Sequence, residues 1–249
     1  MSIVVENVTF ESEGCKLLGR IYRPDTKGKF PAVALCHGYP GDAKNMDLAE
    51  ELAFNNIVSF VFYYQGAWGS EGTYSLKALD SSSRDAIEFL RSKPFVDPKR
   101  VGVNGHSMGA VPASKRLSTD PTLKTGVFMA PNADLTTRVT KENIDKYVER
   151  LMNMGKGKLN ALNPDTLKSE LPWIAKNSNP KDNIKSVKVP LLFIVGSNDT
   201  ATTAEACKIL YENANQPKQF ILIDGADHIF SEHKVPLISN IVTWMKNHL

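Results

Sequence analysis

The sequence predicts an α/β fold with a mostly parallel central sheet of about eight strands and helices on both faces. Three observations indicate this class. Apolar runs of strand length alternate with segments of helical spacing, an order typical of right-handed crossovers between parallel strands. Several of these runs are continuously apolar, as in strands buried on both faces. A further strand, in which Val101 and Val103 form an apolar alternation, passes directly into the tight turn Gly105-x-Ser107-x-Gly109 and then into a helix.

Length and composition predict one soluble globular domain over residues 1–249. Of the 249 residues, 42% are hydrophobic and 23% charged, and a chain of this length can bury a large core. The net charge is +3, with Lys and Arg scattered among Asp and Glu. This pattern indicates neither nucleic-acid binding nor a polybasic membrane contact. No apolar run approaches the roughly 20 residues that span a bilayer.

The N-terminal residues and the cysteines indicate the compartment. No basic segment followed by an apolar one opens the chain, so we expect no signal peptide. The three cysteines, Cys15, Cys36 and Cys207, are odd in number and widely spaced. They favour neither a disulfide framework nor a zinc site, and a reducing cytoplasm fits them best. We expect no metal and no cofactor.

The first hundred residues alternate between strand-like and helix-like segments after an opening hairpin. Residues 2–12 and 15–23 read as two strands joined by a turn at Ser12-Glu13-Gly14. Asp42 can N-cap the first helix. The other elements expected in this part are strands at 31–36 and 57–63, helices at 42–55 and 81–92, and the strand that enters the turn at residues 105–109.

After a strand at 125–130 the alternation breaks. From about residue 131 to 189 no strand-like run occurs, whereas residues 142–152 and the stretch opened by Asn163-Pro164 have helical spacing. Because the insertion of residues 131–189 separates two strands of the sheet, we expect it to fold over the strand ends as a helical cap. The alternative is a pair of solvated surface helices that cover nothing. The core pattern then resumes with strands at 190–196 and 219–224, a helix at 202–213 and a C-terminal helix.

The turn at residues 105–109 is where we expect nucleophilic chemistry. Between a strand and a helix, Gly-x-Ser-x-Gly holds its serine in a strained conformation with the hydroxyl raised off the sheet edge. Side chains in place of Gly105 and Gly109 would collide with the strand and helix that the turn joins. The N–H of Met108 then lies at a helix start, which favours a developing negative charge. The simpler interpretation is an ordinary Gly/Ser turn.

A serine hydroxyl needs a base to act as a nucleophile, and the base needs an acceptor that holds its tautomer. Ser107, Asp199 and His228 each follow a predicted strand. Because parallel strands end at one edge of the sheet, we expect these three side chains to converge. The remaining histidines fit the role of the base less well. His248 is terminal, and His233 lies in the predicted last helix. His106 should point away from the serine, and His37 is placed to brace the loop that follows it.

Three other aspartates compete with Asp199 for the role of the acid. Asp224 and Asp227 are too close to His228 along the chain to hold its imidazole comfortably, and they can simply shape the loop. Asp134, which follows the strand at 125–130, is the stronger alternative. Asp199 stays the preferred acid because it follows the later strand that the chain order requires.

A tetrahedral intermediate also needs donors for its oxyanion. The N–H of Met108 is one expected donor, and the second should come from the loop after the strand at 31–36, where Tyr39 is best placed. Losing one such donor typically costs about 2.7–4 kcal/mol in the barrier. The segment from His37 to Gly41 also reads as a plain strand-ending turn.

In the order and identity of these motifs, the chain resembles the α/β-hydrolase superfamily. Residues 105–109 resemble its nucleophile elbow, residues 37–39 its oxyanion loop, residues 196–199 its acid loop and residues 225–228 its histidine loop. The match covers nearly the whole chain outside the insertion. Within the superfamily, the small cinnamoyl-type esterases and the catalytic domain of the prolyl oligopeptidase group look nearest.

The resemblance implies the α/β-hydrolase fold and a carboxylesterase that cleaves small esters through an acyl-enzyme intermediate. Two departures accompany it. This chain has Tyr64 and Gln65 where such esterases usually carry an Asp and an Arg, and only two short strands precede the core where the peptidases have a gating domain. An aminopeptidase- or amidase-like acyl hydrolase of the prolyl oligopeptidase type stays open, as does a non-catalytic scaffold for ligand or protein binding.

Aromatic side chains near the expected mouth of the site indicate an apolar substrate pocket. The residues expected to line it are Trp68, Tyr74, Trp173 and Phe230. Each of these is also typical of plain packing. We expect a small-molecule ester as the partner, and a homodimer through the last strand and helix is compatible with the pattern.

Overall fold

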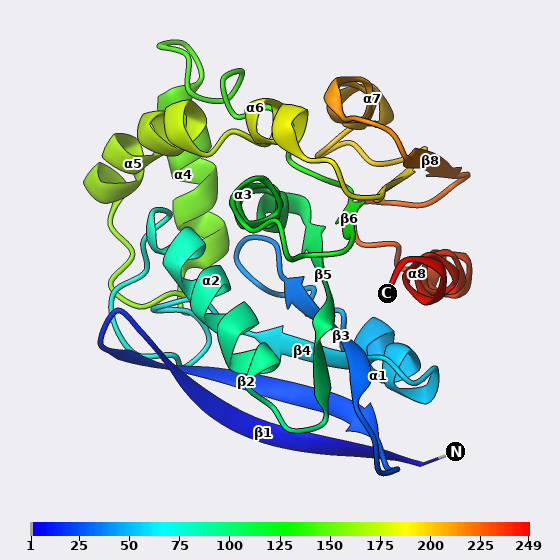
Figure 1. Ribbon diagram of the computed structural model, residues 1–249. Coiled ribbons are helices and arrows are strands. Elements are labelled where there is room, and N and C mark those ends of the chain that lie inside the picture. Colours follow the sequence, from blue (N-terminus) through cyan, green and yellow to red (C-terminus); the bar gives the residue numbers. More distant parts are fainter. Residues whose placement is uncertain (1) are drawn as a thin grey trace.

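An eight-stranded sheet runs through the centre of the computed structural model, which describes residues 2–249 (Figure 1). The strands are β1 (Ile3–Ser12), β2 (Cys15–Pro24), β3 (Phe30–Cys36), β4 (Val58–Phe62), β5 (Val96–His106), β6 (Gly126–Met129), β7 (Leu191–Gly196) and β8 (Lys218–Ile223). They lie in the order β1-β2-β4-β3-β5-β6-β7-β8. The β1–β2 and β2–β4 pairs are antiparallel and all the others are parallel. The expected mostly parallel sheet of about eight strands is confirmed.

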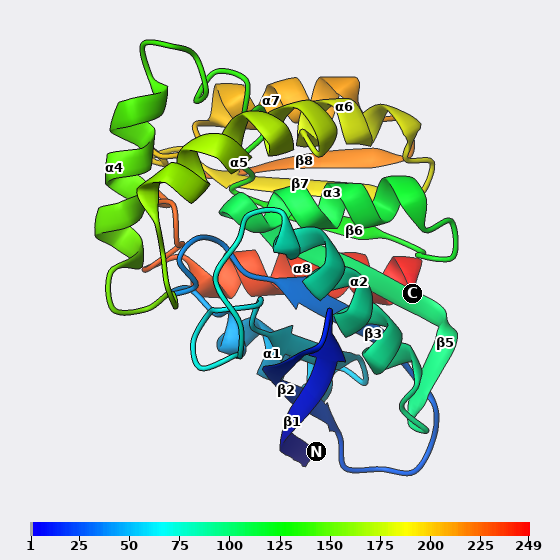
Figure 2. The same cartoon turned by 90° about the vertical axis from the view of Figure 1, so that its left-hand side faces the viewer.

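Helices cover both faces of this sheet (Figures 1 and 2). They are α1 (Met46–Phe54), α2 (Ala78–Arg91), α3 (Ala110–Thr119), α4 (Ile144–Gly155), α5 (Pro164–Asn177), α6 (Pro180–Asn183), α7 (Ala204–Asn213) and α8 (Lys234–His248). The helices α1 and α8 pack on one face, whereas α2, α3 and α7 pack on the other.

The buried strands divide their side chains between two cores. In β7, Leu191, Phe193 and Val195 point to the core under α2, α3 and α7, and Leu192 and Ile194 point to the core under α1 and α8. Successive residues of a strand face opposite sides of the sheet, so a strand covered on both sides must be apolar at every position. This arrangement explains the continuous apolar runs in the sequence.

Helix boundaries differ from the expectation by a few residues, and two of the differences change the place of a named residue. The first helix begins at Met46 rather than after Asp42, because Asn45 adopts a left-handed conformation (φ 54°) that a helix cannot contain. Asp42 remains in the loop and forms an ion pair with Lys158. The last helix begins at Lys234, so His233 precedes it instead of lying within it.

The insertion at residues 131–189 is helical, as its spacing predicts. It contains α4, α5, α6 and a 3-10 turn at Ile184–Ser186. The side chain of Asn163 caps α5 by accepting hydrogen bonds from the N–H groups of Asp165 and Thr166. Figure 2 shows α4 beside the ends of the central strands, where the hydroxyl of Tyr39 donates a hydrogen bond to the carbonyl of Leu151 (2.6 Å). Within residues 2–249, no helix has the length and apolarity needed to cross a bilayer.

Candidate active site

The turn after β5 holds Ser107 in a conformation that most residues avoid. Its backbone φ is 54°, and the short 3-10 turn Ser107–Gly109 leads from it into α3. A Cβ at Gly105 would lie 2.7 Å from the carbonyl oxygen of Gly109, and a Cβ at Gly109 would collide with the carbonyl of Cys36. Both glycines are therefore needed for β3, β5 and α3 to approach this closely.

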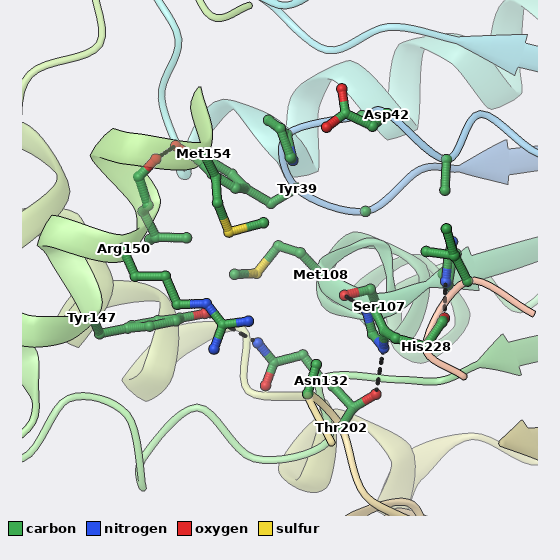
Figure 3. A pocket seen from close by; sticks show the side chains of 18 of the residues that line it. Tyr39, Asp42, Ser107, Met108, Asn132, Tyr147, Arg150, Met154, Thr202 and His228 are labelled. Carbon is green, nitrogen blue, oxygen red and sulfur yellow. Dashed lines mark hydrogen bonds between the residues drawn. The ribbon is translucent and has the colours of Figure 1, made fainter. Parts of the chain in front are cut away.

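The structure brings Ser107, His228 and Asp199 together at the carboxyl edge of the sheet. Figure 3 shows Ser107 and His228 side by side at the cavity. His228 Nε2 lies 3.0 Å from Ser107 Oγ, and His228 Nδ1 lies 2.8 Å from Asp199 Oδ2. With the Nδ1–H donating to the carboxylate, Nε2 is left to accept the proton of the serine hydroxyl. The three residues follow β5, β7 and β8, whose parallel arrangement brings their ends to one rim.

Asp199 is buried, and its carboxylate is fully engaged. Oδ1 accepts hydrogen bonds from the N–H groups of Ala201 and Thr202, and the Thr202 hydroxyl lies 2.8 Å from Oδ2. Burial by itself raises the pKa of Asp199, but the hydrogen bonds from His228 and Thr202 outweigh it and hold this pKa below its usual value. The carboxylate is therefore ionised near pH 7 and can stabilise a positive imidazole.

The three competing aspartates accept hydrogen bonds from residues other than His228. Asp134 accepts hydrogen bonds from Thr136, Asn179 and Lys181. Asp224 accepts a hydrogen bond from Ser197, and Asp227 accepts hydrogen bonds from residues 229 and 231 of its own loop. None of the three contacts the ring of His228, so the geometry favours Asp199 among the four.

The loop after β3 runs directly against the serine. A Cβ at Gly38 would lie 2.9 Å from Ser107 Cβ, which places the next residue, Tyr39, beside the nucleophile candidate. His37 Nδ1–H donates to the carbonyl of Gly38 (2.7 Å), and the Tyr64 hydroxyl donates to the carbonyl of His37 (3.2 Å). Tyr64, which stands with Gln65 where such esterases usually carry an Asp and an Arg, thus helps to fix this loop.

The ring of His106 forms a hydrogen bond to the backbone of His228, which lies far from it in the sequence. Its ring is buried, and Nε2 lies 3.1 Å from the carbonyl oxygen of His228. Burial lowers the pKa of His106 to about 4, so the ring is neutral near pH 7 and can donate this hydrogen bond. Through this hydrogen bond the ring of His106 supports the loop that carries His228.

A cavity of about 270 Å³ opens above Ser107. Its lining includes Tyr39 and Met108 from the two loops, Asn132 from the loop after β6, and residues of α4. The residues of α4 that take part are Tyr147, Arg150, Leu151 and Met154. The insertion therefore covers the site, and the alternative of two helices that cover nothing is wrong.

The four aromatic residues expected in the pocket do not line it. The Trp68 indole donates to the carbonyl of Pro40 (2.8 Å), and the ring of Tyr74 packs edge-on behind that of Tyr39. Phe230 is fully buried in the core under α1 and α8. Trp173 is 43% exposed on α5, on the side of Lys77. Packing in the core or on the surface explains all four.

The lining residues that we did not predict left a weak signal in the sequence. Tyr147, Leu151 and Met154 recur at helical spacing and so share one face of α4. The spacing shows that they share a face but not what that face covers. Within residues 2–249, no group of three or more His, Cys, Asp or Glu side chains gathers as metal ligands would.

Comparisons with known proteins show the family to which the chain belongs. Residues 67–249 match the prolyl oligopeptidase family. An uncharacterised protein of Mycobacterium tuberculosis is 27% identical over 230 residues, which cover 89% of this chain and 72% of that protein.

Two solved structures share the fold over almost the whole chain. Est1E from Butyrivibrio proteoclasticus, with ferulic acid bound, has a TM-score of 0.79 at 16% identity and covers 97% of this chain and 98% of its own. The Pyrococcus furiosus esterase Pf2001 has a TM-score of 0.74 at 22% identity and covers 99% and 91%, respectively. The fold is that of the α/β-hydrolases. The chain belongs to the prolyl oligopeptidase family and is a serine hydrolase.

Proposed function

We propose that the protein is a carboxylesterase that cleaves small carboxylic esters through an acyl-enzyme intermediate on Ser107. The hydrogen-bonded series from Ser107 Oγ to His228 Nε2 (3.0 Å), and from His228 Nδ1 to Asp199 Oδ2 (2.8 Å), carries the proposal. Such a series supplies both the base that activates a serine and the carboxylate that holds the base in one tautomer.

In the proposed reaction, His228 Nε2 takes the hydroxyl proton of Ser107 while the oxygen attacks the acyl carbon. The N–H groups of Tyr39 and Met108 donate to the oxyanion that forms. His228 then passes the proton to the leaving alcohol. A water molecule, deprotonated by the same ring, attacks the acyl-enzyme and releases the acid and the free serine. Asp199 stabilises the imidazolium in both halves of the reaction.

The size and lining of the cavity support a small ester. Besides Tyr39 and Met108, the apolar side chains of Leu151, Met154 and Ile229 face this space of about 270 Å³, and pockets for small ligands are mostly apolar with a few polar groups. Two proteins of similar fold are named as esterases. An amidase or aminopeptidase activity is the second candidate, because the family match is to prolyl oligopeptidases.

The test is a panel of 4-nitrophenyl esters of increasing acyl length, run beside aminoacyl 4-nitroanilides. We expect kcat/KM to be larger for at least one short ester than for any anilide, and both activities to vanish in Ser107→Ala. Faster turnover of an anilide than of every ester would overturn the preference for esters and favour the amidase.

A further inference from the structure

The cavity above Ser107 has an excess of positive charge. Arg138 and Arg150 both line it, whereas its one acidic lining residue, Asp42, is paired with Lys158 (2.6 Å). Among residues 2–249, no carboxylate lies within 4 Å of either arginine. Neither guanidinium group therefore forms an ion pair with a carboxylate in the described part of the chain.

Both arginines lie close to the reacting groups. A guanidinium N–H of Arg138 donates to the carbonyl of Ala201 (2.9 Å), and the next residue, Thr202, places its hydroxyl 3.2 Å from Nδ1 of His228. Figure 3 shows Arg150 reaching from α4 across the cavity toward Asn132. The backbone N–H of Asn132 in turn donates to the carbonyl of Ser107 (2.9 Å).

Tyr147 lies next to both guanidinium groups. Its hydroxyl accepts a hydrogen bond from the Asn132 amide (3.3 Å), and the guanidinium of Arg138 is 5.8 Å from its ring centre. Burial raises the pKa of Tyr147, and the charges of Arg138 and Arg150 both act in the opposite direction. The phenol and the Asn132 amide therefore stand as neutral hydrogen-bonding groups beside two cations, an arrangement suited to a negatively charged ligand.

The positive region continues outward from the cavity. An adjoining hollow is lined by six residues, none of them acidic: Thr137, Arg138, Asn143, Lys146, Tyr147 and Arg150. A third cation, Lys146, thus lines this hollow together with the two arginines. Like charges that gather without counter-charges repel one another, and an anion that binds among them removes that cost.

We propose that the substrate carries a carboxylate in addition to the ester that Ser107 attacks, and that Arg138 and Arg150 bind this carboxylate. The proposal rests on the proposed function and names its substrate class. A guanidinium matches a carboxylate through two parallel N–H···O bonds. Arg138 is held in place by the carbonyl of Ala201, and Arg150, an exposed residue of α4, lines the same cavity.

A matched pair of esters tests the proposal. Mono(4-nitrophenyl) adipate and 4-nitrophenyl hexanoate have acyl chains of the same length and differ in a terminal carboxylate. We expect kcat/KM to be higher for the adipate hemiester. The ratio of kcat/KM for the adipate hemiester over that for the hexanoate should fall about tenfold or more in Arg150→Met and in Arg138→Met. It should be partly restored in Arg150→Lys. In the wild-type protein, the same ratio should decrease as salt is added. Because the readout is a ratio, general damage to the site cancels.

A control variant and a second pair sharpen the result. Arg84→Met removes an equal charge from α2, where Arg84 pairs with Glu13 and Asp85 outside the cavity, and it should leave the ratio unchanged. The pair 3-acetoxybenzoate and 3-acetoxybenzamide places the carboxylate on the alcohol side instead. A preference for the carboxylate in either pair that depends on Arg150 supports the proposal. Equal turnover within both pairs, or a preference indifferent to Arg138 and Arg150, overturns it.

Binding separates this proposal from the proposed function. Calorimetric titration of Ser107→Ala with monomethyl adipate and with methyl hexanoate needs no turnover. We expect monomethyl adipate to bind more tightly than methyl hexanoate, and its affinity to fall about tenfold when Arg150→Met is added. This result would support the carboxylate site even if no ester were cleaved. Equal affinity for the two ligands would reject the site even if Ser107 proved to be an efficient esterase nucleophile.

Discussion

At the scale of single residues, His228 is held at three separate atoms. Nδ1 meets Asp199, Nε2 meets Ser107, and the backbone carbonyl accepts a hydrogen bond from His106. The contact with Asp199 fixes the tautomer of the ring, and the contact with Ser107 fixes the ring plane. The hydrogen bond from His106 fixes the loop that carries His228. In the proposed reaction, a ring positioned in this way needs little rearrangement to take the proton of Ser107, and such positioning is a large part of what these sites contribute to rate.

The role of Asp199 predicts the effect of removing its charge. In Asp199→Asn, we expect kcat on the best ester to fall by a factor on the order of 10³–10⁴, because the amide favours the wrong tautomer of His228 and cannot stabilise the imidazolium. Asp134→Asn is the matched control, and it should keep kcat within a few-fold of wild type. A large loss in the control with little loss in Asp199→Asn would reassign the acid.

The residues of the site were readable from sequence to different degrees. Ser107 and His228 could be named because each lies in a short motif at the end of a predicted strand. The expected pocket residue Phe230 belongs to the core, because an aromatic side chain has the same sequence signature whether it packs against protein or faces a ligand. Tyr147 and Arg150 lie in the insertion, whose path over the sheet no local pattern determines.

At the scale of elements, α4 defines one wall of the cavity. Tyr39 from the loop after β3 donates to the carbonyl of Leu151, which joins the two walls on either side of Ser107. Helical spacing predicted the element, and the position of the insertion between two strands predicted that it would cover the strand ends. The predicted start of α1 was wrong by several residues, because Asn45 has a left-handed backbone conformation and therefore interrupts a segment that has helical composition.

The position of α4 predicts a change in chain-length preference. Met154 faces the cavity, so in Met154→Trp the added ring should fill apolar space and exclude long acyl chains. We expect the ratio of kcat/KM for 4-nitrophenyl octanoate over that for the acetate to fall about tenfold. Glu149→Trp, an exposed position on the same helix, is the control. An unchanged ratio in Met154→Trp would mean that α4 does not contact the acyl chain.

At the scale of the whole molecule, the sheet and its two cores bring together residues from distant parts of the chain. The two central strands β3 and β5 pair in parallel along residues 32–36 and 101–105, which fixes the loop after β3 against the turn after β5. The same packing buries two histidines, His37 and His106, with little access to solvent. Their burial ties the stability of the fold to pH.

This burial predicts a loss of stability in mild acid. The pKa of His37 and of His106 is lowered by burial to about 4, below the ordinary value of 6.5, so the unfolded chain takes up protons first as the pH falls. The stability is therefore present above pH 6.5 and lost as the pH falls toward 4. At about pH 5, each histidine should cost on the order of 2 kcal/mol of unfolding free energy.

Urea denaturation at about pH 7 and about pH 5 measures this loss. In His106→Gln, the difference between the two pH values should shrink by about half, whereas His248→Gln near the C-terminus is the control and should leave it unchanged. An unfolding free energy that is the same at both pH values in the wild type would show that the two buried rings do not govern acid stability.

The central claim is that Ser107 is a nucleophile activated by His228. Labelling of the folded protein with a fluorophosphonate probe, followed by mass spectrometry of the proteolytic peptides, tests it most directly. We predict a single covalent adduct on Ser107 that forms much more slowly in His228→Ala. An unlabelled Ser107 in the folded wild-type protein, or labelling that is equally fast without the His228 ring, would contradict it.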